Sequence, residues 1–403
     1  MSSNPVAPNE RPSKRYAWVI LNQTISPAFE RLVARLCDEL GPGLLLTGSD
    51  FARSSGQLEV RHGPAYDRRN LRRRLASWAR FALWASAECA RLKGAPFLLA
   101  ATNPPLLPQV ALFFRKLRRF PYGVLVWDIY PEHLVHIGVC REGSFVTQAL
   151  TRASALALEG AEFVVTLSDS MAATLKRQTR GTPLRSLEVI PNWADTNALR
   201  PLHKQDNPLA WELGQRDKLT VLYSGNMGAG HTLSGVIEAA ALLESDPRVE
   251  FLFIGDGLSR PALEAEVAQR KLKNVRFFDY QPHDRLPLSL ALGDVAIVAQ
   301  APGTEHLSLP SKTYSSLAVG SAILALTSPQ SDLGKFVTEQ RVGAVHRADD
   351  GTAIAATVQN LADAPDELDE LRTRARELAV ESYSEDAVYT AWRALLAPLV
   401  SPP

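Results

Sequence analysis

The stretch VLYSGNMGAGHTLSGVIEAAALL, residues 221–243, contains a predicted strand, turn and helix in succession. A short apolar run leads into a turn with Gly225, Gly228 and Gly230, and a longer apolar segment follows the turn. A strand joined to a helix through a glycine-rich turn is the unit from which parallel sheets are built. The stretch therefore predicts an α/β fold, although the turn lacks the G-K-[ST] ending of a P-loop.

Short apolar runs alternate with helical patterns along the rest of the chain, as they do in βαβ units. In the second half, we expect strands at residues 219–225, 250–257, 275–280, 295–300, 322–326 and 343–347. In the first half, we expect strands at residues 16–21, 43–48, 96–102, 122–128, 161–168 and 186–192. The pattern predicts two Rossmann-like domains.

The domain boundaries follow from the polar, Pro- and Asn-punctuated segment between the two sets of strands. We expect a loose N-terminus over 1–15, an N-terminal domain over 16–195, a linker over 196–218, a C-terminal domain over 219–380 and a final helical segment over 381–403. Within the last segment, Ser384 is the expected N-cap of the final helix.

The composition is that of an ordinary globular protein. Of the 403 residues, 46% are hydrophobic and 22% charged, which excludes a disordered chain, a collagen and a disulfide-rich scaffold. The net charge of +1 combines a first half with 26 basic and 16 acidic residues and a second half with 18 and 27. Three cysteines without C-x-x-C spacing favour a reducing compartment. No apolar run reaches the roughly 18 residues of a membrane span, so we expect a cytoplasmic protein.

The run LPSKTYSSLAVG, residues 309–320, opens a predicted helix, and Ser311 and Lys312 lie in its first turn. Free N–H groups and the helix dipole favour a phosphate at such a position. The Lys312 ammonium group would add a formal positive charge beside a diphosphate. An ordinary capped helix is the alternative interpretation.

Other candidate binding residues of the second half lie in turns. Asn226 and His231 place polar groups in the glycine-rich turn. Gly255 lies in the strand-to-helix turn FIGDG, for which a simple connection is the favoured alternative. Gln281 and Pro282 follow a predicted strand, at the sheet edge where parallel-sheet proteins bind ligands.

In the first half, the segment VLVWDIYPEHLVHIGV, residues 124–139, ends a hydrophobic run in Asp128 and continues with Glu132, His133 and His136. Polar residues at the carboxyl end of a parallel strand face the usual ligand cleft. The alternative for Asp128 is an N-cap.

A basic segment precedes an apolar helix in the first half. Its arginines are Arg68, Arg69, Arg72, Arg73 and Arg74, and Trp78 follows in the helix. Such a pattern is typical of a surface that binds an anionic membrane or a lipid-linked substrate. A core helix with a solvated arginine-rich start is the alternative, and the pattern contains no nucleic-acid-binding module.

Five motifs stand in the order found in GT-B glycosyltransferases of the retaining family 4, which the chain resembles over most of its length. They are VIPNWADTNALRPL (189–202), YSGNMGAGHTL (223–233), FIGDG (253–257), QPHDRLPLSLALGDVAIV (281–298) and PSKTYSSLAVG (310–320). With NPPLLP (103–108) and WDIYPEHLVHIGV (127–139) upstream, the chain is most similar to bacterial enzymes of lipid-linked O-antigen, capsule or exopolysaccharide synthesis. The resemblance implies two Rossmann-like domains that face each other across a cleft.

The resemblance also implies a nucleotide-sugar donor, here expected to be a UDP-sugar, on the C-terminal domain and an acceptor on the N-terminal domain. It implies transfer without a metal or another cofactor, and the chain contains no Asp-x-Asp triplet. The positions that match the family's donor site are Gly225, Asn226, His231, Gly255, Gln281, Pro282, Leu309, Pro310, Ser311, Lys312 and Ser315.

The chain departs from the family at several charged positions. Asn226 stands where many members carry Arg, so the diphosphate charge would fall more heavily on Lys312. The family's paired glutamates match Leu307 and Ser315, and Glu305 is close enough to substitute for the sugar-contacting one.

A family histidine at the end of an N-domain strand matches Trp127, and we expect the next residue, Asp128, to act on the acceptor side. The expected function is retaining transfer of a sugar to a lipid-linked or polysaccharide acceptor, at the inner face of the plasma membrane and without a nucleic-acid partner. Two alternatives remain. One is a GT-B binding or scaffold subunit with little activity, and the other is an epimerase or inverting transferase, which would need a carboxylate or histidine base.

Overall fold

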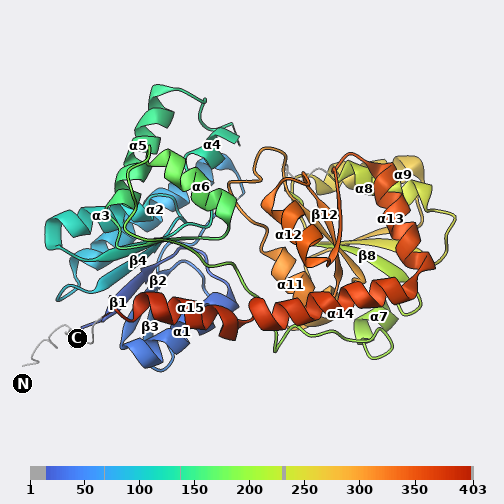
Figure 1. Ribbon diagram of the computed structural model, residues 1–403, viewed down its shortest axis with the longest axis horizontal. Coiled ribbons are helices and arrows are strands. Elements are labelled where there is room, and N and C mark those ends of the chain that lie inside the picture. The colour runs from blue at the N-terminus through green and yellow to red at the C-terminus, as the bar shows by residue number, and fades with distance from the viewer. Residues whose placement is uncertain (1–14, 68, 137, 229–232, 401–403) are drawn as a thin grey trace, which may run out of the picture.

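The computed structural model describes residues 15–400 apart from 68, 137 and 229–232. Within these residues, the chain forms two sheets that lie beside each other, each with helices on both faces (Figure 1). Neighbouring strands pair in parallel in both sheets. The predicted α/β fold of two Rossmann-like domains is thus confirmed.

The first sheet has the strand order β3-β2-β1-β4-β5-β6-β7. Its strands are β1 Trp18–Leu21, β2 Gly43–Thr47, β3 Leu58–His62, β4 Phe97–Ala101, β5 Tyr122–Leu125, β6 Val164–Thr166 and β7 Leu187–Val189. Six of them lie within the expected ranges. Strand β3 was not predicted, because its sequence LEVRH carries two charges and lies half-exposed at the edge of the sheet.

Helices cover both faces of the first sheet. They are α1 Pro27–Leu40, α2 Leu71–Ala90, α3 Leu107–Arg118, α4 Glu132–His136, α5 Phe145–Glu159 and α6 Asp169–Gln178. Buried side chains of α2, α3, α5 and α6 pack on one face. The other face is covered by α1 and by α15, Glu385–Leu396, from the end of the chain.

The second sheet has the order β10-β9-β8-β11-β12-β13. Its strands are β8 Leu219–Ser224, β9 Val249–Ile254, β10 Val275–Phe278, β11 Val295–Ala299, β12 Ala322–Leu326 and β13 Gly343–His346. Its helices are α7 Pro208–Glu212, α8 Ser234–Leu242, α9 Arg260–Arg270, α10 Leu286–Leu290, α11 Lys312–Ala318, α12 Asp332–Gln340, α13 Gly351–Asp363 and α14 Pro365–Ser382, with a 3₁₀ turn at His283–Arg285. The strand order reverses between β8 and β11, so their carboxyl ends form the topological switch point at which such sheets bind ligands.

The chain passes between the domains a second time after α14 (Figure 1). At this crossing, the N–H of Ala194, which follows β7, donates to the carbonyl of Tyr383 at 2.9 Å. Ser384 caps α15 as expected, because its Oγ accepts a 3.3 Å hydrogen bond from the N–H of Ala387. Trp392 of α15 then packs into the core of the N-terminal domain.

A loop of the C-terminal domain also contacts the N-terminal domain. Leu307, between β11 and α11, is buried in the core of the N-terminal domain. Its carbonyl accepts a 3.1 Å hydrogen bond from the N–H of Ile129. Farther along, Ser170 donates to Asp332 across the same boundary at 2.5 Å. The two carboxyl edges are therefore held close together.

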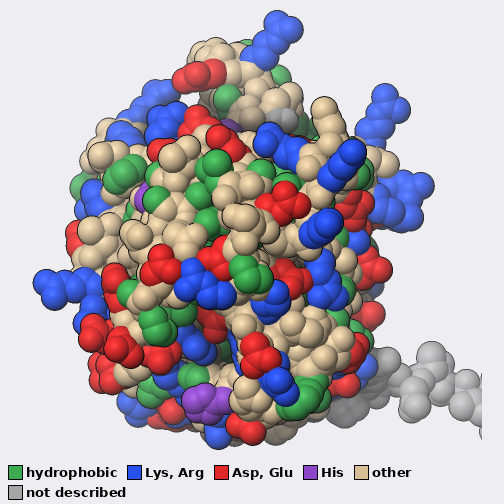
Figure 2. Space-filling view, turned by 90° about the vertical axis from the view of Figure 1, so that its right-hand side faces the viewer, with side chains coloured by type: hydrophobic (Ala, Val, Ile, Leu, Met, Phe, Trp, Pro, Cys, Tyr) green, Lys and Arg blue, Asp and Glu red, His purple; other side chains and the backbone are tan. Residues whose placement is uncertain are grey.

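One face of the C-terminal domain points away from the N-terminal domain. It carries both acidic and basic side chains, with hydrophobic side chains scattered between them (Figure 2). Neither acidic nor basic side chains cover this face alone (Figure 2). Among the described residues, no helix has the length and hydrophobicity needed to cross a membrane.

Candidate functional site

A pocket of about 400 Å³ opens at the switch point of the second sheet. The glycine-rich turn after β8 forms one wall, and the start of α11 forms another. Its lining includes Ser224, Gly225, Asn226, Tyr280, Leu286, Ser311, Lys312, Ser315, Ser316 and Ser321. Two segments that are about 90 residues apart in sequence therefore meet here, as the sequence predicted.

The Lys312 ammonium group occupies the centre of this meeting point. Its Nζ lies 3.8 Å from the centre of the Tyr223 ring and is closed off from solvent. A Cβ atom added at Gly225 would lie 3.3 Å from Nζ. Nζ has no hydrogen-bond partner among the described residues. Burial lowers the pKa of this ammonium group to about 7, because a charge without partners is unfavourable in a protein interior.

Helix α11 is shorter than the sequence pattern suggested. It spans seven residues, and the side chain of its N-cap, Ser311, makes no capping hydrogen bond. The N–H groups of Thr313 and Tyr314 already bond to the carbonyls of Pro310 and Ser311 at 3.2 Å. Few backbone groups are left to meet an anion, so the formal charge of Lys312 matters more than the helix dipole.

Two glycine turns interlock beside the pocket. Gly225 has φ of 128° and Gly255 has φ of 140°, in the left-handed region that favours glycine. A Cβ atom at Gly255 would lie only 2.1 Å from the Gly225 carbonyl oxygen. Gly255, a predicted donor-binding residue, therefore acts here by letting the backbone of β9 approach the glycine-rich turn.

Of the other residues predicted to bind the donor, some line the pocket and others do not. Asn226 and Ser315 line the pocket, whereas the Gln281 side chain turns back to donate to the Asp279 carbonyl at 3.2 Å. Tyr280, which the sequence interpretation missed, lines the pocket with half of its surface exposed. Only its position directly before the Gln-Pro pair could have indicated it.

Leu309 and Pro310 lead into α11. Leu309 packs against the cores of both domains, so it positions the loop before the helix. Pro310 supplies the carbonyl that bonds to Thr313. His231, also predicted to contact the donor, lies outside the described residues.

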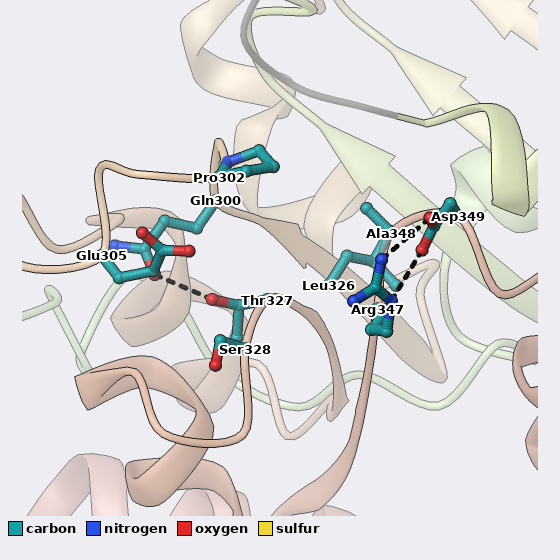
Figure 3. Close-up of a pocket in the computed structure, with 9 residues that line it drawn as sticks. All are labelled: Gln300, Pro302, Glu305, Leu326, Thr327, Ser328, Arg347, Ala348 and Asp349. Carbon is teal, nitrogen blue, oxygen red and sulfur yellow. Dashed lines mark hydrogen bonds and ion pairs between the residues drawn. The ribbon is translucent and has the colours of Figure 1, made fainter. Parts of the chain in front are cut away.

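Glu305 belongs to a neighbouring pocket of about 230 Å³ at the ends of β11, β12 and β13. Figure 3 shows its carboxylate beside Gln300, whose amide oxygen accepts from Thr327 at 3.1 Å. On the opposite side, Arg347 and Asp349 pair with each other at 3.1 Å. Glu305 thus lines a pocket adjacent to the one around Lys312 and is half-buried there.

The Lys312 pocket continues into the space between the domains. Ser311, Ser315 and Leu286 also line a larger cavity of about 530 Å³. The N-terminal domain contributes Phe29 and Trp127 to it, with ring centres 5.4 Å apart. A ligand bound at Lys312 can therefore reach the cleft between the two domains.

Asp128 lies three residues beyond β5 and directly follows Trp127, which lines the cavity between the domains. Its N–H donates to Thr102 Oγ1 at 3.3 Å, and the next residue, Ile129, bonds to Leu307. Burial raises the pKa of the Asp128 carboxyl, and the positive charges of His133 and Arg74 oppose this rise. Asp128 nevertheless keeps some exposure and is half-buried.

The basic segment divides into two parts around α2. Arg69, Arg72 and Arg73 are exposed, and Arg69 pairs with Asp67 at 2.6 Å. Arg74 instead lies over the Trp78 ring, with its guanidinium carbon 5.2 Å from the ring centre.

Trp78 itself is only 5% exposed. The predicted contact of Trp78 with lipid is therefore wrong, because its indole packs inside the domain, as in the alternative of a core helix. Arg68 lies outside the described residues.

Two Rossmann-like domains whose carboxyl edges face each other across a cleft form the GT-B fold of glycosyltransferases. Residues 218–364 match the family model described as Glycosyl transferases group 1. The chain is a GT-B glycosyltransferase, and its C-terminal domain is of the group 1 type.

Two similar proteins that are named as glycosyltransferases match this chain over different lengths. WbjE of Pseudomonas aeruginosa, named a probable glycosyltransferase, is 26% identical over 384 residues, which cover 93% of this chain and 94% of WbjE. WcaI of Escherichia coli K12, whose name describes a colanic acid biosynthesis glycosyl transferase, is 33% identical over 197 residues, 48% of each chain. The crystal structure of Anabaena HepE in complex with UDP has a TM-score of 0.70 at 15% identity, covering 95% of this chain and 100% of HepE.

Proposed function

We propose that the protein transfers a sugar from a UDP-sugar to a glycan acceptor with retention of the anomeric configuration, in the synthesis of a cell-surface polysaccharide. The names of WbjE and WcaI support the reaction class and the polysaccharide context. The UDP bound to HepE, which has the same fold, supports the nucleotide.

The position of Lys312 is the observation that carries this proposal. A buried ammonium group without a hydrogen-bond partner among the described residues is unfavourable unless a ligand supplies the counter-charge. Gly225 and Lys312 line the same pocket, and a Cβ atom at Gly225 would lie only 3.3 Å from Nζ. A diphosphate in this pocket would pair with the ammonium group and place the sugar toward the cleft.

In the proposed reaction, an acceptor hydroxyl oxygen bonds to the anomeric carbon while the bond from that carbon to the diphosphate oxygen breaks. The hydroxyl proton passes to the departing diphosphate, and UDP leaves. Lys312 stabilises the negative charge that develops on the diphosphate. Asp128 would lie on the acceptor side of the cleft. An inverting reaction would instead use Asp128 as a base, and NMR of the anomeric proton in the product separates the two outcomes.

The proposed reaction uses no metal. The sequence lacks the Asp-x-Asp triplet of metal-dependent transferases, and Lys312 would supply positive charge at the proposed diphosphate position. Glu305 is proposed to contact the transferred sugar from the neighbouring pocket. Addition of EDTA to the purified enzyme is expected to leave the transfer rate unchanged.

The proposed acceptor is lipid-linked, and the enzyme would work at the inner face of the plasma membrane. At the start of α2, Leu71 and Leu75 are 42% and 39% exposed beside the exposed Arg72 and Arg73. Apolar and basic side chains together favour an anionic lipid surface. Binding to phosphatidylglycerol vesicles at low salt is expected, and its absence would remove the membrane part of the proposal.

A screen of UDP-, GDP- and ADP-sugars by calorimetric binding, followed by donor hydrolysis assays, tests the donor directly. Binding of UDP-sugars in preference to the other two classes is expected. Absence of both binding and hydrolysis for all three classes would favour a scaffold subunit over an enzyme.

A further inference from the structure

The pocket that Glu305 lines, which we call the Glu305 pocket, is small and partly apolar. It measures about 230 Å³, below the roughly 300–1,000 Å³ of sites for drug-sized ligands, so it suits a single ring or substituent. Pro302, Leu326 and Ala348 contribute apolar side chains to it. Figure 3 shows Leu326 and Ala348 on the side opposite Glu305. A ligand in the Glu305 pocket therefore meets an apolar wall that faces a carboxylate.

Most side-chain donors of the Glu305 pocket already bond within the protein. Gln300 Nε2 donates to the Ser308 carbonyl at 2.8 Å, and Thr327 Oγ1 donates to the Gln300 amide oxygen at 3.1 Å. Ser328 Oγ donates to an amide oxygen two residues farther along the chain at 2.7 Å. The pocket therefore offers a ligand few free hydroxyl or amide donors.

The charged side chains leave one negative charge unpaired in the Glu305 pocket. Arg347 donates from both Nε and Nη2 to the Asp349 carboxylate, at 3.1 Å each. No hydrogen bond or ion pair joins the Glu305 carboxylate to the other lining residues drawn in Figure 3. A guanidinium has five N–H donors, so Arg347 keeps N–H groups that do not bond to Asp349. The carboxylate of a sugar acid would be repelled by Glu305.

The Glu305 pocket lies beside the Lys312 pocket along the carboxyl edge of the second sheet. Strand β11 stands between β8, at the Lys312 pocket, and β12, at the Glu305 pocket. Neighbouring strands are about 4.8 Å apart, so the two pockets are separated by roughly 10 Å. The loop after β11 runs from Gln300 in one pocket to Ser311 in the other. A sugar bonded to a diphosphate at Lys312 can therefore reach the Glu305 pocket.

We propose that the Glu305 pocket binds the acetamido substituent of the donor sugar, so that the protein selects UDP-linked N-acetylamino sugars over plain hexoses and sugar acids. The amide N–H, which can only donate, bonds to the Glu305 carboxylate. The amide oxygen accepts from Arg347, and the methyl group packs on Leu326 and Ala348. A hydroxyl in the same position would leave the apolar wall without a contact. This inference rests on the proposed transfer from a UDP-sugar and adds the class of sugar.

The test compares UDP-sugars that differ only in this substituent. UDP-N-acetylglucosamine is paired with UDP-glucose, and UDP-N-acetylgalactosamine is paired with UDP-galactose. UDP-glucuronic acid represents the sugar acids. Isothermal titration calorimetry measures the affinity of each for the full-length wild-type protein. UDP alone is titrated in the same way and gives the contribution of the nucleotide.

Two variants change the Glu305 pocket in different ways. Glu305→Ala removes the acceptor, and Ala348→Leu fills the space beside the apolar wall. Glu339→Ala, at an exposed position of α12, is the matched control. We expect the wild type and the control to bind at least one N-acetylated donor about tenfold or more tightly than its paired hexose, because a polar contact and a methyl contact distinguish the two.

Both pocket variants are expected to lose this preference while their affinity for UDP alone stays unchanged, which also shows that they are folded. Equal affinity within both pairs in the wild type would overturn the inference and, as long as UDP binds, would leave the proposed function in place. A preference that persists undiminished in either pocket variant would also overturn the inference, as would tightest binding of UDP-glucuronic acid. Failure of the wild type to bind UDP would overturn the proposed function and the inference with it.

Discussion

The Nζ of Lys312 lies 3.8 Å from the centre of the Tyr223 ring, beside a glycine turn and without a hydrogen-bond partner among the described residues. The π face of Tyr223 supplies only a small part of the stabilisation that an ammonium group loses on leaving water. We therefore propose that this pair is a site for an anion, and that it costs the protein stability when no ligand is bound.

The first prediction concerns that stability. Lys312→Met is expected to raise the free energy of unfolding at pH 7 by roughly 1–4 kcal/mol, because a pKa lowered by burial measures the cost of the buried charge. Chemical denaturation followed by circular dichroism measures the change. Lys335→Met, at an exposed position on α12, is the control and is expected to have little effect.

The stability gained in Lys312→Met depends on pH. The unfolded chain keeps the ordinary lysine pKa of 10.5, whereas the folded pKa is about 7. Between these values, the unfolded state binds more protons, so wild-type stability attributable to Lys312 rises with pH. The advantage of Lys312→Met should be largest below pH 7 and fade toward pH 10. An advantage that is constant over this range would contradict the lowered pKa.

The second prediction is proton uptake on donor binding. A diphosphate beside Lys312 stabilises its charged form and raises its pKa in the complex. Above pH 7, binding of UDP-glucose should take up close to one proton, and affinity should fall by up to about tenfold per pH unit. Calorimetry in buffers of different ionisation enthalpy counts the proton. Below pH 7 the uptake should disappear, and uptake that persists in Lys312→Met would assign it to another group.

The third prediction separates backbone strain from steric conflict at the interlocked turns. Gly255→Ala is expected to destabilise the protein by more than about 3 kcal/mol, because its Cβ would overlap the Gly225 carbonyl. Gly94→Ala also has positive φ, at 77°, but open space around it, and should cost only about 1 kcal/mol. Thermal unfolding of the two variants compares them. Equal losses would mean that the turns separate easily.

The fourth prediction concerns the contact between the domains. Leu307→Ala removes a buried side chain from the N-terminal core and should cost about 2–4 kcal/mol. Sugar transfer should slow because the acceptor side is held less firmly, whereas UDP affinity should stay unchanged. Leu242→Ala, at an exposed position of α8, is the control. Unchanged transfer in Leu307→Ala would show that this contact does not position the acceptor.

The sequence indicated the strands well because parallel strands buried on both faces are continuous apolar runs. Only β3, an edge strand with alternating charges, escaped this criterion. Trp78 was misplaced for a related reason: an arginine-rich helix start looks the same whether the aromatic residue behind it faces lipid or core. Its burial is decided by the packing of Tyr66 and Tyr130 against it, which the sequence does not show.

The pocket around Lys312 was partly predictable. The glycine turn and Lys312 are local motifs, and their meeting follows from the switch-point rule for parallel sheets. Tyr280 follows β10, whereas Lys312 and Ser315 follow β11. Tyr280 was missed because only the folding of these loops over the edge of the sheet brings it to the same pocket. The link from Ile129 to Leu307 was also hidden, since it joins residues 178 positions apart across two domains.

Calorimetric titration of UDP into the wild-type protein, Lys312→Met and Lys335→Met at pH 6.5 tests the central claim most directly, under conditions in which Lys312 is mostly charged. The account predicts that the wild type and Lys335→Met bind UDP alike, and that Lys312→Met binds about tenfold to a hundredfold more weakly, since it lacks one buried charge-assisted contact. Equal UDP affinity in Lys312→Met and the wild type would contradict the account.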